Sequence, residues 1–211
     1  LNGALQNDPS TFGLGLRLSG ANVTIKGFVI NGFSTQGILI TGAGATGNTV
    51  SGCYIGTNAA GTAAVANTFA GIEIKDGATN NVIGGTTAAA RNVISGNSAQ
   101  GVSIHGTGTS ENLVRGNYLG LNAGGTGAVA NAFAGVEIGT GATNNTVGGT
   151  TAAERNVISG NTAQGAFIRG TGTTGNTVRG NYLGLNAPGT SAVPNGFSGT
   201  EIAEGASGNT I

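Results

Sequence analysis

The amino-acid sequence predicts an all-β solenoid, in which short strands form coils that stack along one axis. The first observation is a four-residue pattern, a glycine followed by alternating apolar residues, which recurs seven times in 211 residues. Its copies begin at Gly15, Gly37, Gly71, Gly101, Gly135, Gly165 and Gly199. The second is the alternation itself, because a period of two residues belongs to strands. The third is that 43 of the 211 residues are glycine, which disfavours helices and supplies turns.

Each coil, called a rung from here on, divides into three short strands. The first strand follows the glycines above, and the second ends in an apolar residue, a variable residue and a glycine, as at residues 50–52. The third strand follows at once, as at residues 53–55. Residues 1–14 do not fit this pattern and contain a turn signal at residues 8–10. We therefore predict a lead-in segment over residues 1–14 and one repeat domain over residues 15–211.

The spacing of the rungs defines a larger unit. Successive first-strand glycines are 22, 34, 30, 34, 30 and 34 residues apart. The spacings alternate because a short insertion follows the second strand on some rungs, and a longer one follows the third strand at residues 58–70, 122–134 and 186–198. The unit is therefore 64 residues long and contains two rungs, which gives about seven rungs in the chain.

Stacking places equivalent residues of successive rungs above one another, about 4.8 Å apart. The inward positions of the first strand then form two mainly apolar columns. One consists of Leu16, Ile38, Ile72, Val102, Val136, Ala166 and Thr200, and the other of Leu18, Ile40, Ile74, Ile104, Ile138, Ile168 and Ile202. A polar column is expected just before the second strand, where stacked amides can hydrogen-bond to one another. This asparagine ladder consists of Asn48, Asn81, Asn112, Asn145, Asn176 and Asn209.

Several rungs resemble a known family. Residues 156–161, Asn-Val-Ile-Ser-Gly-Asn, and residues 176–182, Asn-Thr-Val-Arg-Gly-Asn-Tyr, are similar to right-handed parallel β-helix repeats of the pectate-lyase-like type. The resemblance covers residues 15–211 and implies a single right-handed parallel β-helix. Such repeats are common in long bacterial surface and secreted proteins, which implies an extracellular or cell-surface location. The family includes polysaccharide lyases and hydrolases, phage tailspikes and adhesins, so the resemblance specifies the fold better than the activity.

Composition excludes several classes of protein. The formal net charge is zero and 8% of the residues are charged, so the chain lacks the basic patch that nucleic acid requires. No run of about 18 apolar residues is present, so no membrane span is expected. Residues 170–175 match G-x-G-x-x-G, but a strand pattern follows in place of a helix, and we expect no cofactor.

Three residues are the best candidates for catalysis. Glu73 and Glu137 face outward on first strands two rungs apart, about 10 Å between backbones, which approaches the separation of an inverting glycosidase pair. His105 is the one histidine and lies on the rung between them. Duplication of the 64-residue unit explains both glutamates equally well, and the acidic clusters that bind calcium or perform acid–base catalysis in the resembled family are missing. We therefore favour a protein that is not an enzyme, with no metal site.

Aromatic residues recur with the same 64-residue period. Tyr54, Tyr118 and Tyr182 lie on third strands, and Phe69, Phe133 and Phe197 end the long insertions. These rings could stack against sugars. We favour a structural role, in which all six hold the insertions against the rungs and bury apolar area.

These observations favour a structural scaffold in an extracellular, cell-surface or filamentous assembly. The sequence stops at residues 209–211 inside a second strand, without a polar cap. We therefore expect either a fragment of a longer β-helix or copies that stack head to tail into a fibre. The alternative function is a secreted protein that binds or degrades polysaccharide along the outer face of the first strands. The expected partners are accordingly a second copy of the chain or a polysaccharide.

Overall fold

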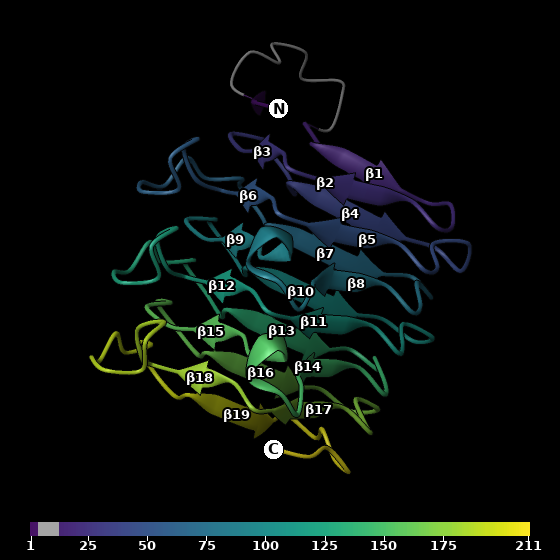
Figure 1. Cartoon of the computed structure of the whole chain (residues 1–211). Coiled ribbons are helices and arrows are strands. Elements are labelled where there is room, and N and C mark those ends of the chain that lie inside the picture. Colours follow the sequence, from purple (N-terminus) through teal and green to yellow (C-terminus); the bar gives the residue numbers. More distant parts are fainter. Residues whose placement is uncertain (4–12) are drawn as a thin grey trace.

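The computed structural model describes residues 1–3 and 13–211, and it confirms a right-handed parallel β-helix. Figure 1 shows the rungs stacked from the N-terminal end to the C-terminal end, with the strands arranged in three sheets. All strand pairs join neighbouring rungs in parallel. The predicted turn at residues 8–10 lies outside the described residues.

The three sheets collect the first, second and third strands of the rungs. Sheet 1 consists of β1 (Leu16–Leu18), β4 (Ile38–Thr41), β7 (Ile72–Lys75), β10 (Val102–His105), β13 (Val136–Gly139), β16 (Ala166–Arg169) and β19 (Thr200–Ala203). Sheet 2 consists of β2 (Thr24–Lys26), β5 (Thr49–Ser51), β8 (Val82–Gly84), β11 (Leu113–Arg115), β14 (Thr146–Gly148) and β17 (Thr177–Arg179). Sheet 3 consists of β3 (Val29–Ile30), β6 (Tyr54–Ile55), β9 (Val93–Ile94), β12 (Tyr118–Leu119), β15 (Val157–Ile158) and β18 (Tyr182–Leu183).

The predicted columns form one side of the core, which also contains apolar residues of sheets 2 and 3 such as Ile83 and Ile94. Ile38 pairs with Ile72 and Ile72 with Val102, so each column continues from one rung to the next in register. Ile40, Ile74 and the other central members are fully buried. Burying each large aliphatic side chain contributes about 1.5–3 kcal/mol, so the same stabilising contact is repeated along the axis.

The predicted asparagine ladder is confirmed. On each interior rung the side-chain Nδ2 donates both to the Oδ1 of the next asparagine and to a backbone carbonyl of the rung before. Asn81 illustrates this, because its Nδ2 lies 2.9 Å from Asn112 Oδ1 and 3.0 Å from Ala45 O. The Oδ1 accepts two further bonds, from the backbone N–H and the Nδ2 of Asn48, at 3.0 and 2.9 Å. The buried amide therefore has its hydrogen-bonding capacity filled.

Two further ladders run parallel to the predicted one. The second lies at the corner between sheets 2 and 3 and consists of Asn92, Asn117, Asn156 and Asn181. The third lies at the corner between sheets 3 and 1 and consists of Asn67, Asn97, Asn131, Asn161 and Asn195. Each of the three corners thus has its own column of amides, which satisfies the backbone groups of the turns.

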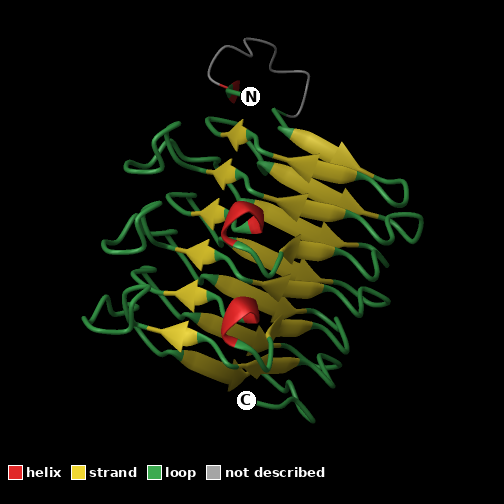
Figure 2. Ribbon diagram, in the orientation of Figure 1, coloured by secondary structure: helices red, strands yellow, loops and turns green. Residues whose placement is uncertain are grey.

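The insertions project from the corners of the rungs. Figure 2 shows two helical turns, η2 (Ala88–Ala90) and η3 (Ala152–Glu154), one above the other between sheets 2 and 3. The three long insertions extend from the opposite end of sheet 3. They also contact one another, because Ala123 N donates to Gly61 O and Ala187 N to Gly125 O, both at 2.8 Å.

The first three residues of the chain lie beside sheet 3. The Leu1 amino group donates to Val29 O at 2.7 Å, and Gly3 N donates to Asn31 O at 2.9 Å. This part of the predicted lead-in therefore continues the sheet by main-chain hydrogen bonds.

Candidate functional site

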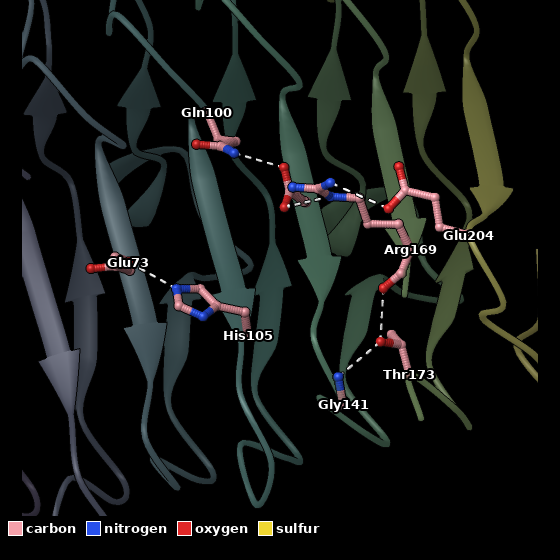
Figure 3. Close-up of polar contacts among 8 residues, drawn as sticks. Glu73, Gln100, His105, Gly141, Arg169, Thr173 and Glu204 are labelled. Carbon is pink, nitrogen blue, oxygen red and sulfur yellow. Dashed lines mark hydrogen bonds and ion pairs between the residues drawn. The ribbon is translucent and has the colours of Figure 1, made fainter. Parts of the chain in front are cut away.

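The outer face of sheet 1 carries an open groove of about 370 Å³, into which the candidate residues project. Its lining includes Gln36, Phe69, Glu73, Gln100, Glu137 and Arg169. Polar side chains lie here because every second residue of a strand points away from the core. Figure 3 shows the contact between Glu73 and His105, which come from the neighbouring strands β7 and β10.

Glu73 on β7 is surrounded by three polar neighbours. His105 Nε2 lies 2.8 Å from Glu73 Oε1, and Gln36 Nε2 donates to Oε2 at 2.6 Å (Figure 3 shows the histidine contact). Lys75 Nζ lies 3.5 Å from the same Oε2. Partial burial acts to raise the pKa of Glu73, but the hydrogen bond with His105 and the charge of Lys75 together outweigh it and lower the pKa.

Glu137 on β13 has an equivalent environment with a different cation. Gln100 Nε2 donates to Glu137 Oε2 at 2.6 Å, and Arg169 Nε donates to Oε1 at 3.0 Å. Arg169 also reaches Glu204, with Nη1 at 3.3 Å from Oε2 (Figure 3). The Glu137 side chain is 7% exposed and that of Arg169 is 39% exposed, so a buried carboxylate is paired with a half-exposed guanidinium.

The two clusters follow one rule across three rungs. A glutamine just before one sheet 1 strand bonds a glutamate on the next strand, and a cationic or imidazole side chain on the third strand bonds the other oxygen. Gln164 and Glu201 repeat the first contact at 2.7 Å. Sequence reasoning missed the glutamines, although their 64-residue spacing matches that of the glutamates and could have revealed them.

The contacts of Glu73, His105 and Glu137 disfavour a catalytic role for these three candidates. The structure joins Glu73 to His105 directly, whereas Glu137 lies beyond β10, with Ser103 between the two glutamates in register. Both oxygens of each carboxylate accept hydrogen bonds, and a general acid needs a raised pKa whereas that of Glu73 is lowered. Among the described residues, no three His, Cys, Asp or Glu side chains converge as metal ligands would.

The six predicted loop-holding aromatics occupy two environments. The tyrosines alternate with Val93 and Val157 on sheet 3 and pack against residues of the long insertions such as Ala123. The phenylalanines do not share that setting. Phe69 is 51% exposed and Phe197 is 76% exposed, and Phe133 packs edge to face on Phe167 with ring centroids 6.2 Å apart. The prediction that the phenylalanines hold the insertions by burying apolar area stays a prediction, and the exposure of Phe69 and Phe197 argues against it.

Comparison with protein-family models, with curated proteins and with solved structures gives no match to this chain. The described residues contain no helix with the length and apolar character needed to cross a membrane. The protein is thus a right-handed parallel β-helix by fold, and the side chains of its surface are the evidence for its function.

Proposed function

We propose that the chain is a structural scaffold, a stiff β-helical rod of an extracellular, cell-surface or filamentous assembly. The observation that carries this proposal is the uniformity of the interior. Apolar columns and three amide ladders continue through the central rungs, and the second ladder begins at Asn92 because Cys53 holds the asparagine position on the rung before. An active site usually occupies a place where such a pattern breaks. The extracellular location is supported by the resemblance of the repeats.

The polar side chains of sheet 1 are consistent with the same role. Gln100, Glu137 and Arg169 come from three consecutive rungs and are bonded to one another. A charge network of this kind ties neighbouring strands together on the outside, as the ladders do on the inside. Its groups bond each other, which leaves few free functional groups for chemistry on a substrate.

Light scattering over a dilution series, with negative-stain electron microscopy of the same samples, tests the scaffold. We expect unbranched rods one β-helix wide, whose length grows with protein concentration. Discrete single particles at every concentration, combined with turnover of a polysaccharide that Glu137→Gln abolishes, would contradict the proposal. Glu201→Gln is the matched control for that variant, because Glu201 has the same glutamine contact.

A second candidate function is polysaccharide binding along the sheet 1 groove. The specific observation is that Phe69, which lines the groove beside Glu73 and Gln100, has a ring that is 51% exposed. Exposed rings of this kind can stack against sugar faces. Affinity electrophoresis in gels that contain neutral and acidic glycans tests this, with Phe69→Ala expected to release the chain. The buried Phe33→Leu is a control for general destabilisation. Equal mobility of wild type and Phe69→Ala in every glycan would rule the groove out.

A further inference from the structure

The charges of this neutral protein are separated on its surface. Five of the eight Lys and Arg residues lie at the corner where sheet 2 passes into sheet 3, namely Lys26, Arg91, Arg115, Arg155 and Arg179. The one described acidic residue at this corner is Glu154. The other six described acidic residues, Glu73, Asp76, Glu111, Glu137, Glu201 and Glu204, lie on sheet 1 or in the turns that follow its strands. The rod therefore has one cationic side.

Four arginines occupy four successive rungs of this corner, and we call them the arginine line. Arg91 follows η2, Arg115 ends β11, Arg155 follows η3 and Arg179 ends β17. Rungs are about 4.8 Å apart, so the backbones of the four arginines span three rung spacings, about 14 Å. The corner lies beside the two helical turns that Figure 2 shows between sheets 2 and 3.

Two of these guanidinium groups are held in place by tyrosines. Arg91 lies 4.3 Å from the ring centroid of Tyr118, and Arg155 lies 4.1 Å from that of Tyr182. Arg155 Nε also donates to Gly180 O at 3.2 Å, which brings it next to Arg179. Stacking on a ring orients a guanidinium and leaves its outer N–H groups free for a planar anion.

Little negative charge within the protein neutralises the line. Among the described residues, Arg115 alone of the five cations forms an ion pair, with Nη1 at 3.3 Å from Glu154 Oε1. The Glu154 Oε2 is engaged in the turn, where it accepts bonds from Thr150 N and Thr151 N at 3.1 and 3.2 Å. Arg115 Nε is buried without a hydrogen-bond partner. That Nε is out of reach of an external ligand, so the capacity for an external acceptor lies with Arg91, Arg155 and Arg179, which form no ion pair among the described residues.

We propose that the arginine line binds a linear acidic polysaccharide, a glycan that carries one carboxylate or sulfate on each sugar or on alternate sugars. A linear chain of anions that lies along the axis can meet several of these guanidinium groups at once. Arginine forms bidentate hydrogen bonds with such anions. This inference does not depend on the scaffold proposal, and it concerns a different face from the sheet 1 groove.

Two other occupants fit the corner less well. Single-stranded nucleic acid binds through bases that stack on open aromatic faces, and here the faces of Tyr118 and Tyr182 are covered by arginines. A second copy of the chain would have to offer a row of free carboxylates, but Glu73 and Glu137 are bonded within their own clusters and the exposed Glu111 lies alone in the turn after β10. Both remain as outcomes of the test.

Binding of the full chain to immobilised polygalacturonate, heparin and neutral dextran tests the proposal. We expect binding to at least one acidic glycan and none to dextran. Arg179→Ala is expected to weaken it about five- to tenfold and to reduce the slope of log affinity against log salt by about one. Arg17→Ala removes an equally exposed arginine from sheet 1 and is the matched control, with affinity expected to stay within about twofold.

Glu154→Ala provides a test that misfolding cannot imitate. Ala90 holds the equivalent position in η2, so the substitution makes the second turn resemble the first. It frees Arg115, and we expect affinity for the acidic glycan to rise about two- to fivefold. The proposal is overturned if Arg17→Ala weakens binding as much as Arg179→Ala, or if Glu154→Ala leaves affinity unchanged. It is also overturned if single-stranded DNA competes equally, or if sedimentation shows that Arg179→Ala abolishes self-association instead of glycan binding.

Discussion

Replacing one amide in the middle of a ladder should be far more damaging than its size suggests. Asn112→Ala removes four hydrogen bonds of a side chain that is 1% exposed. The two acceptors that bonded the Asn112 Nδ2 each keep another donor. Asn145 Oδ1 still accepts from the Asn112 backbone N–H at 3.0 Å, and Ala78 O still accepts from Ser110 N at 3.4 Å. The Asn81 N–H and one proton of its Nδ2 lose their acceptor and stay buried.

Each buried donor left unpaired costs about 1–3 kcal/mol, so Asn112→Ala should lower the free energy of unfolding by about 2–6 kcal/mol. That is a large share of the stability of an ordinary domain, about 5–15 kcal/mol. Denaturant unfolding followed by circular dichroism measures the loss. Amide hydrogen exchange should also locate it, with Asn81 exchanging faster than amides three rungs away.

The matched control is Asn122→Ala in a long insertion. Asn122 Oδ1 accepts from Thr126 N at 3.0 Å in an exposed setting, where water can replace it. We expect a cost of no more than about 1 kcal/mol. If Asn112→Ala costs no more than Asn122→Ala, or if Asn81 exchange is unchanged, the reasoning about unpaired donors fails.

Three further predictions concern the core, a turn and pH. Ile104→Ala should cost about 2–5 kcal/mol and Ile104→Val about 0.5–1.5 kcal/mol in the same unfolding assay; equal costs would contradict close packing around this fully buried side chain. Gly84→Ala should cost at least about 2 kcal/mol more than Gly27→Ala. Both glycines have positive φ, at 97° for Gly84 and 74° for Gly27. A Cβ on Gly84 would lie 1.9 Å from the Arg115 carbonyl oxygen of the next rung, whereas a Cβ on Gly27 would have no heavy atom within 4 Å. Similar costs for the two substitutions would show that backbone strain alone matters. The lowered pKa of Glu73 means that its charge stabilises the fold above its ordinary value of 4.5, and this stabilisation is lost as pH falls through the lower folded value. Stability measured against pH should therefore fall less steeply on the acid side in Glu73→Gln, and parallel curves would contradict the assignment.

The columns could be predicted because they depend on local pattern. Ile72 and Val102 occupy the same place after a first-strand glycine, and the structure pairs them in register. The first ladder was found for the same reason, since its asparagines precede similar strands. The third ladder was missed because its members alternate between two contexts. Asn97 follows a third strand closely, whereas Asn131 ends a long insertion, and only the folded insertion brings them to 2.9 Å.

The surface networks depend on contacts between rungs that no single repeat contains. Gln100 and Glu137 are 37 residues apart, and Arg169 lies a further 32 residues along the chain. The arginine line is also composed of unlike positions, because Arg115 ends a strand and Arg155 follows a helical turn. Their proximity requires the geometry of the corner, so a count of scattered basic residues could not reveal it.

The 64-residue unit gives this protein a property closer to that of a synthetic polymer than of a compact domain. The contact between Gln36 and Glu73 recurs between Gln100 and Glu137, so the boundary between one unit and the next is chemically the same each time. A recombination event that deletes or duplicates 64 residues in frame would rejoin matching ladders and columns. Length then becomes a heritable variable that changes in steps of two rungs, about 9.6 Å, while the cross-section and its surface pattern stay constant.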